Sequence, residues 1–174
     1  MKRFFLPLLI GFFFLTLQTT LLTPPSIQRV RPDLLLVLTL YLGIYYPPIS
    51  GCLLTFLIGF LMDLFSGNSF GLYTFTRPFI FYLTQLFKDR FYLQGFSSKF
   101  LFVFLFALLE GLLTLLLIAV LNPNPLGHLY PLFFTFLLPQ SFITGLVTPV
   151  LFSLFNKGFS FLFNRNGTGI KERG

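Results

Sequence analysis

Long runs without a charged residue dominate this sequence and restrict what it can fold into. Residues 4–22 form a run of 19, enough to cross a hydrocarbon core of about 30 Å as a helix that rises about 1.5 Å per residue. Residues 34–62 form a run of 29, and further apolar runs cover 70–87, 100–121 and 129–156. Charged residues make up only 10% of the chain, against roughly 25% in soluble domains. These features predict an integral membrane protein, exclude a disordered chain and argue against a soluble domain.

The second run has to be divided. As one helix it would be about 43 Å long, which is too long without a steep tilt. Pro47 and Pro48 lie in its middle, and Pro48 disfavours helical geometry at Pro47. We therefore expect an all-α membrane domain over residues 1–156, followed by a basic cytoplasmic tail over 157–174. Its six short transmembrane helices are predicted at about 4–22, 33–47, 49–64, 70–87, 100–121 and 132–156.

The positions of the basic residues predict the orientation, because cytoplasmic loops carry an excess of Lys and Arg. Six spans place both termini in the cytoplasm and leave only Arg29 and Arg31 outside. The residues then inside are Lys2, Arg3, Lys88, Arg90, Lys99, Lys157, Arg165, Lys171 and Arg173. Five spans would put two basic residues inside and nine outside. A reversed five-span chain restores nine inside, but it places Lys2 and Arg3 outside and still needs the overlong helix.

The two ends of the chain differ in character. The first 22 residues begin with basic residues, as a signal peptide does, but no small-x-small cleavage site follows the apolar run. We therefore expect an uncleaved first span. In the tail, residues 158–163 are apolar and are expected to lie along the inner membrane interface. No internal repeat is evident, so the sequence does not indicate an inverted-repeat transporter.

Several function classes receive no support from the residues. The net charge of +7 comes from residues at the edges of apolar runs, which indicates topology signals facing lipid headgroups and no nucleic-acid partner. The single cysteine, Cys52, lies in an apolar run, so we expect neither a disulfide nor a metal cluster. The only histidine, His128, falls in an expected external loop, which argues against a Ser–His pair within the membrane. No catalytic residue, metal or cofactor is predicted, and the many Phe side chains are expected to face membrane lipid.

Two aspartates stand at predicted helix ends. Asp33 follows Pro32, and a carboxylate at a helix start suits the orphan N–H groups and the positive end of the helix dipole. An N-terminal cap at the outer interface is the simpler role for it. Asp63 closes the third span, where a carboxylate opposes the dipole. It therefore needs either a structural partner, such as Arg77 or loop N–H groups, or a direct ligand.

Arg77 and Glu110 lie inside predicted spans, away from the span ends, which makes them functional candidates like the two aspartates. Arg77 can extend outward to the interface or pair with a carboxylate, and Glu110 is either uncharged or paired. A hairpin at 66–69 would bring Asp63 and Arg77 together in the outer half of the membrane, so we predict that these two pair. The alternative is that Arg77 pairs with Glu110 while Asp63 serves a partner or ligand.

Two glycines accompany these charges. Gly67 and Gly71 are most simply explained by a turn and a close approach between helices. Gly111 would permit close packing beside Glu110. The structural or partner-binding candidates are therefore Asp33, Asp63, Gly67, Gly71, Arg77 and Glu110.

Several of these residues also carry a family resemblance. The segment Arg-Pro-Asp-Leu-Leu-Leu-Val at 31–37, then Gly51 and Gly59, then Asp-Leu-Phe-Ser-Gly at 63–67 and Gly-Leu-Tyr at 71–73, resembles the rod shape-determining protein MreD family. The resemblance is specific over about 30–87 and architectural beyond it. It implies a non-enzymatic membrane subunit of the bacterial cell-elongation complex, which builds lateral peptidoglycan. The expected partners are MreC, MreB, RodA and a transpeptidase. The fold would resemble the substrate-binding membrane subunits of energy-coupling-factor transporters.

A second function fits the same architecture. A vitamin-binding membrane subunit of an energy-coupling-factor transporter would also have six helices, but it would need a polar pocket reachable from outside. The chain offers few polar groups for such a ligand. A third possibility, an integral membrane enzyme, has little support from the residues.

Overall fold

The computed structural model describes residues 2–20, 32–66, 71–90, 95–121 and 137–164, and every regular element in them is a helix. This confirms the predicted all-α class, with one helix at each of the six expected places. The helices are α1 (Lys2–Thr20), α2 (Leu34–Tyr45), α3 (Pro48–Ser66), α4 (Leu72–Phe87), α5 (Phe96–Leu121) and α7 (Leu138–Asn164).

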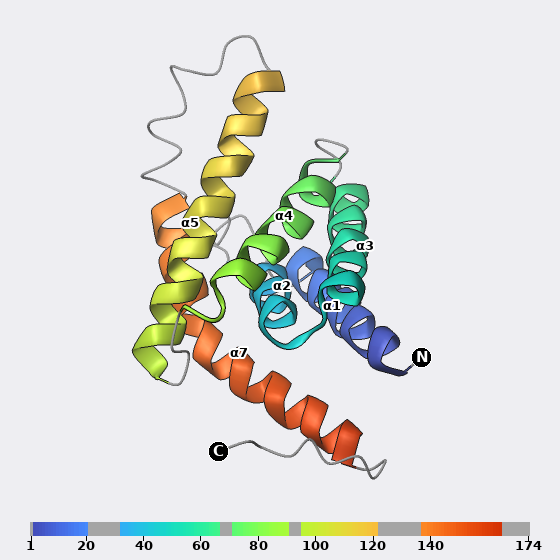
Figure 1. Cartoon of the computed structure of the whole chain (residues 1–174). Helices are drawn as coiled ribbons and strands as arrows, with labels where there is room; N and C mark the ends of the chain where they lie inside the picture. Colours follow the sequence, from blue (N-terminus) through green and yellow to red (C-terminus); the bar gives the residue numbers. More distant parts are fainter. Residues whose placement is uncertain (1, 21–31, 67–70, 91–94, 122–136, 165–174) are drawn as a thin grey trace.

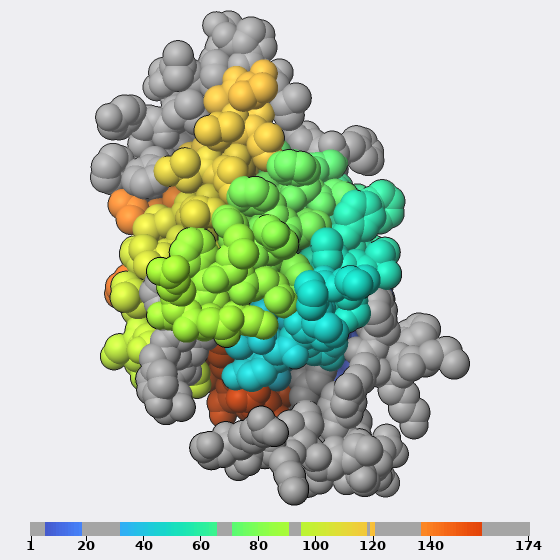
Figure 2. All heavy atoms as spheres, in the orientation of Figure 1, coloured from blue at the N-terminus to red at the C-terminus, as the bar shows by residue number. Residues whose placement is uncertain are grey.

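Helix α2 forms the centre of the bundle and packs against each of the other five helices (Figure 1). Every residue from Leu35 to Gly43 is buried. Since α2 is apolar on all its faces, it can be satisfied only where neighbours surround it. The α3–α4 hairpin and the α5–α7 pair cover it from two directions, and α1 packs against α2 and α3. In Figure 2 the side chains of α4 cover α2 from the front.

The break between α2 and α3 occurs at the predicted prolines. Tyr46 has extended backbone angles (φ −104°, ψ 152°), as expected for a residue that precedes proline. Helix α3 then begins at Pro48, a position where the missing N–H costs nothing. The carbonyl oxygen of Tyr46 accepts a hydrogen bond of 2.8 Å from the Gln85 side chain of α4. The polar backbone at the break is therefore satisfied by a neighbouring helix.

The surface differs from that of a soluble protein, although the core is also mostly apolar. Large apolar side chains such as Ile49, Phe75 and Val120 are among the most exposed, whereas Arg77 and several hydroxyl groups are fully buried. The buried hydroxyls of Thr55 and Thr84 donate to backbone carbonyls one turn earlier in their own helices. A surface of this kind suits lipid, because charged and polar groups are costly there and apolar groups are not.

Three of the helices are long and apolar enough to cross a membrane, with candidate segments Pro48–Phe65, Phe96–Leu117 and Leu138–Lys157. Two shorter apolar helices, Leu6–Gln18 and Leu34–Tyr45, accompany them. The 12 residues of α2 extend about 18 Å, less than a hydrocarbon core of about 30 Å. The prediction that all six helices span the membrane therefore remains a prediction.

Several observed helix ends differ from those expected, and the two largest extensions past a predicted span are in α5 and α7. Helix α5 begins at Phe96 instead of at 100, and α7 continues to Asn164 instead of ending at 156. Both extensions carry a lysine, Lys99 and Lys157, which the charge-free runs excluded. A helix need not stop where its apolar run stops, because its ends can extend past the hydrocarbon core. The first part of the predicted tail is thus helical.

Successive helices alternate in direction. In Figure 1 the start of α1, the α2–α3 break, the end of α4 and the end of α7 all lie toward the lower end of the molecule. The α3–α4 connection and the end of α5 lie toward the upper end. The start of the first helix, α1, and the end of the last helix, α7, thus lie on the same side of the bundle.

Candidate functional site

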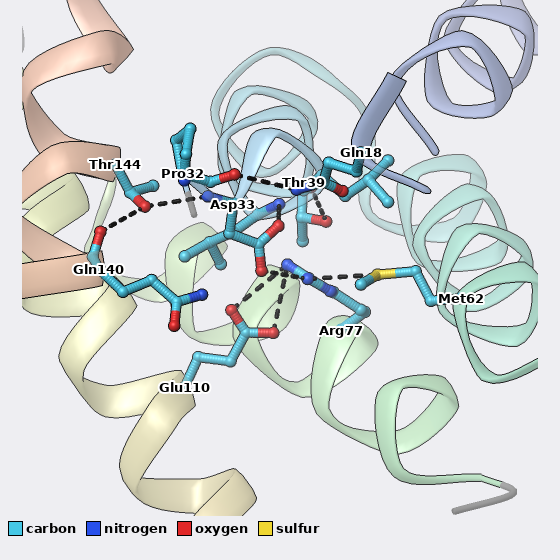
Figure 3. Close-up of polar contacts among 11 residues, drawn as sticks. Gln18, Pro32, Asp33, Thr39, Met62, Arg77, Glu110, Gln140 and Thr144 are labelled. Carbon is cyan, nitrogen blue, oxygen red and sulfur yellow. Dashed lines mark hydrogen bonds and ion pairs between the residues drawn. The ribbon is translucent and has the colours of Figure 1, made fainter. Parts of the chain in front are cut away.

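The buried side chain of Arg77 lies at the centre of the main polar cluster, where helices α2, α3, α4 and α5 meet (Figure 3). The buried residues of helix α4 repeat at spacings of three and four, which places them on one face of the helix. They are Leu72, Thr76, Arg77, Ile80, Phe81 and Thr84. Arg77 belongs to this face and therefore points into the bundle, away from lipid. We refer to Arg77, Asp33 and Glu110 as the Arg77 cluster.

Asp33 joins two structural roles in one carboxylate. As the N-cap of α2, it accepts a hydrogen bond of 2.8 Å from the backbone N–H of Leu36 through Oδ1. Its second oxygen, Oδ2, lies 2.7 Å from Nη2 of Arg77. The expected cap is therefore confirmed, and the same side chain also forms an ion pair that the sequence did not reveal.

Glu110 supplies the second carboxylate from the middle of α5. Its Oε1 and Oε2 atoms lie 3.2 and 3.3 Å from Nη1 of Arg77. Oε2 accepts a hydrogen bond from Nη1, whereas Oε1 is only close enough for an ion pair and accepts no well-directed hydrogen bond from any residue that the structure describes. The cluster thus sets one buried and one partly buried carboxylate against one guanidinium, an arrangement that holds three helices together.

Neighbouring groups complete the surroundings of the cluster. Nη2 of Arg77 also lies 3.3 Å from the sulfur of Met62. The guanidinium carbon of Arg77 lies 5.7 Å from the ring centre of Tyr73. The backbone N–H of Asp33 donates to Oγ1 of Thr144 on α7 at 3.0 Å. From α1, the amide of Gln18 donates to the carbonyl oxygen of Pro32. All six helices therefore contribute to the cluster or its immediate surroundings.

The predicted pair of Asp63 and Arg77 is wrong, because Arg77 pairs with Asp33 and Glu110. Asp63 instead accepts hydrogen bonds from the backbone N–H groups of Tyr73 at 3.0 Å and Thr74 at 2.7 Å. The hydroxyl of Thr74 donates to it as well, at 2.5 Å. These N–H groups belong to the first turn of α4, whose own N-cap, Gly71, has no side chain. Asp63 at the end of α3 thus caps α4, and the positive dipole end of α4 accounts for its charge.

The glycines take partly different roles from those expected. Gly71 has a positive φ of 96°, with open space where a Cβ would be, so it serves a turn and no close approach. The close approach of α3 to α4 occurs at Gly59, where an added Cβ would lie 2.4 Å from the carbonyl oxygen of Tyr73. Gly111 packs closely against Leu137, as expected. Gly67 and His128 lie outside the described residues.

A cavity of about 200 Å³ adjoins the Arg77 cluster between α2, α4, α5 and α7. Its polar lining consists of the side chains of Asp33, Tyr73, Glu110, Thr114, Gln140, Ser141 and Thr144. Leu36, Ala107, Leu115 and Leu137 supply its apolar walls. The cavity is bounded by the second half of α5 and the beginning of α7, toward the upper end in Figure 1.

Comparison with known proteins gives one assignment. The sequence model of the rod shape-determining protein MreD family matches residues 2–161, nearly the whole chain. The chain belongs to the MreD family. No curated protein and no solved structure shows significant similarity to it.

Membership in the MreD family confirms the resemblance seen in the sequence and extends it beyond residues 30–87. It carries a role in rod shape determination, as a bacterial membrane protein of the MreBCD shape complex. Three of the quoted segments acquire a structural reason in this MreD-family chain. The segment at 31–37 contains the N-cap Asp33, and the segments at 63–67 and 71–73 join Asp63 to the helix start that it caps.

The sequence reasoning missed the polar residues of α7. Ser141, Thr144 and Thr148 are buried, and their spacing of three and four residues places them in one stripe on a face of α7. That spacing was a signal in the sequence. Gln140 beside this stripe and Thr114 on α5 reach the same cavity. Their hydroxyl and amide groups were overlooked because they carry no charge.

Proposed function

We propose that this chain is a non-enzymatic membrane subunit of the bacterial complex for lateral peptidoglycan synthesis, and that it maintains rod shape by binding MreC. The observation that carries this proposal is the match of the MreD family over residues 2–161. MreB, RodA and a transpeptidase are the further partners that this role implies. A scaffold also suits a bundle whose charged interior groups bind one another, as Arg77, Asp33 and Glu110 do.

The location that follows is the inner membrane, with six spans and both termini in the cytoplasm. Two observations support it. The helices alternate in direction, and α1 begins at the same end of the bundle at which α7 finishes (Figure 1). At this end lie the basic residues Lys88, Lys99 and Lys157, which are near the ends of α4, α5 and α7.

The transporter-subunit alternative receives less support. The cavity beside the Arg77 cluster is the kind of polar pocket that this alternative needs. The family assignment, however, carries rod shape determination, and the likeness to energy-coupling-factor subunits remains an expectation. We therefore retain the wall-growth role as the proposed function.

Depletion of the protein in its rod-shaped host tests the role in wall growth. We expect the cells to widen and become round, because lateral wall synthesis would lose a subunit, and cell width measured by microscopy reports this. Re-expression of the wild-type chain should restore the rods, and affinity-tagged chain should co-purify with MreC from detergent-solubilised membranes. Rods of unchanged width together with lost vitamin uptake would contradict the proposal and favour the transporter subunit.

A further inference from the structure

We propose that the cavity beside the Arg77 cluster is a binding site for a primary ammonium group, carried either by a lipid headgroup or by a small soluble amine. The cavity holds about 200 Å³ between α2, α4, α5 and α7. This site goes beyond the scaffold role, which needs no ligand.

The charge of the lining selects a cation. Asp33 and Glu110 both line the cavity, while Arg77 is the one basic group that faces them among the described residues. Two carboxylates against one guanidinium leave a net negative charge when both are ionised. Glu110 is 95% buried, and its Oε1 atom lies 3.2 Å from Nη1 of Arg77 but accepts no well-directed hydrogen bond from the described residues. A buried acceptor in this state favours a donor that enters from the cavity.

The other polar groups add acceptors around the same space. Figure 3 shows the side-chain amide of Gln140 directed into the space beside Asp33 and Glu110. Ser141 and Thr144 line the cavity, and their hydroxyl groups donate hydrogen bonds of 2.8 and 2.7 Å to backbone carbonyls. Each hydroxyl therefore keeps acceptor capacity. A group with several N–H donors complements this lining better than a group that only accepts.

The size and the apolar walls select an organic ligand. A volume of about 200 Å³ greatly exceeds the ~30 Å³ that one water occupies in the liquid, so a single bare ion would leave most of it unfilled. Leu36, Ala107 and Leu137 supply walls suited to methylene groups. No group of three or more His, Cys, Asp or Glu side chains that could hold a metal occurs in the described part of the chain. An alkylammonium such as ethanolamine combines the charge, the donors and the carbon atoms that these walls require.

The position of the cavity allows either source of the amine. Its walls belong to the beginning of α2, the second half of α5 and the beginning of α7. In the proposed topology these segments lie in the outer half of the membrane. An ethanolamine headgroup of a lipid and a soluble amine from the periplasmic side could both reach this level.

The test uses the full-length protein in phosphatidylcholine nanodiscs, with ethanolamine as the probe and its effect on thermal unfolding as the measurement. Ethanolamine should bind at least about ten-fold more tightly than tetramethylammonium, which has the same charge but no N–H group. Sodium chloride at equal ionic strength should have no effect. Equal binding of the two organic cations, binding of sodium alone, or no binding would overturn the proposal.

Variants connect the binding to this cavity. Glu110→Gln should weaken ethanolamine binding by about ten-fold or more, because a charge-assisted hydrogen bond is lost. Ser141→Leu should abolish it by filling the cavity, whereas Ser153→Leu on the exposed face of the same helix should leave it unchanged. If either cavity variant does not fold, Thr114→Leu fills the space from α5. Unchanged ethanolamine binding in folded cavity variants would also overturn the site.

A second arm identifies the source of the amine. The protein is reconstituted in nanodiscs with equal parts of phosphatidylethanolamine and phosphatidylcholine, and native mass spectrometry measures which lipid remains bound. Selective retention of phosphatidylethanolamine, lost in Ser141→Leu and kept in Ser153→Leu, assigns a lipid headgroup. Binding of free ethanolamine without lipid retention assigns a soluble amine. Absence of both contradicts the proposal.

Discussion

At the scale of single residues, Arg77 is the largest fully buried side chain among the described residues, and it carries a charge. Its side chain is completely buried, and Asp33 and Glu110 together surround its charge. Replacing one member of a buried ion pair leaves the other charge unpaired in a medium of low dielectric constant. The free-energy cost of this unpaired charge exceeds the net stabilisation that the intact pair provides. The cluster should therefore respond strongly to the loss of the arginine and more weakly to the loss of one carboxylate.

Alanine substitutions test this arrangement. Arg77→Ala should lower the free energy of unfolding in detergent by about 3–5 kcal/mol, because two carboxylates lose their shared partner. In a double-mutant cycle, Arg77→Ala and Glu110→Ala should be coupled by about 0.5–3 kcal/mol, since the two side chains are in contact. The cycle with Asp63→Ala is the control and should give a smaller coupling. A coupling to Asp63 that exceeds the coupling to Glu110 would contradict the observed pairing.

At the scale of elements, two residues near the end of α3 hold the beginning of α4 in place. Asp63 caps the first turn of α4, and Gly59, one turn earlier on α3, lets the backbone of Tyr73 approach closely. The cap requires the approach, because Asp63 can reach the N–H groups of Tyr73 and Thr74 only when the two helix ends are in contact. The position of α4, and with it the direction of Arg77, therefore depends on a residue without a side chain.

Gly59→Ala should separate the two helices. Its Cβ would lie 2.4 Å from a backbone carbonyl oxygen, which cannot rotate away as a flexible side chain can. We expect a loss of about 1–3 kcal/mol in the free energy of unfolding, typical of overpacking. Gly95→Ala serves as the control, since its Cβ would meet only Ser98 Oγ at 3.7 Å, and it should cost less. Equal stability of the two variants in thermal unfolding would argue against a close α3–α4 contact.

At the scale of the whole molecule, the bundle has an apolar core that also contains the Arg77 cluster and buried hydroxyl groups, and it exposes further aromatic and aliphatic groups. Exposed side chains such as Phe12, Phe79 and Leu154 belong to different helices, so the apolar surface is spread around the bundle. This suits a protein surrounded by lipid, with no need for a soluble domain to position it. The helices alternate in direction along the chain.

The proposed six-span topology makes a direct prediction for reporter fusions. Fusions after residues 28, 48, 67, 94, 126 and 170 should alternate between outside and inside, beginning outside. The reason is the excess of Lys and Arg on the side that holds both termini. Enzymatic reporters that are active on only one side of the membrane measure this. An external signal after residue 170 would refute the model.

The sequence by itself determined the class of protein and the helix breaks. Charge-free runs predict membrane-spanning helices because lipid excludes unpaired polar groups, and Pro47 and Pro48 required the break between α2 and α3 for steric reasons. These properties depend on neighbours along the chain, so the sequence could predict them. The cap formed by Asp33 is local in the same sense, since it bonds the N–H of Leu36 three residues later.

Only the tertiary structure decided which charges meet. Arg77 needed a carboxylate, and the sequence offered Asp33, Asp63 and Glu110 without ranking them by distance. The choice depends on the rotation of each helix about its axis and on which helices become neighbours, and neither is a local property. Asp63 is nearer to Arg77 along the chain, but it is held by the first turn of α4. The face of α4 that carries Arg77 turns toward α2 and α5, where Asp33 and Glu110 lie, 44 and 33 residues away in sequence.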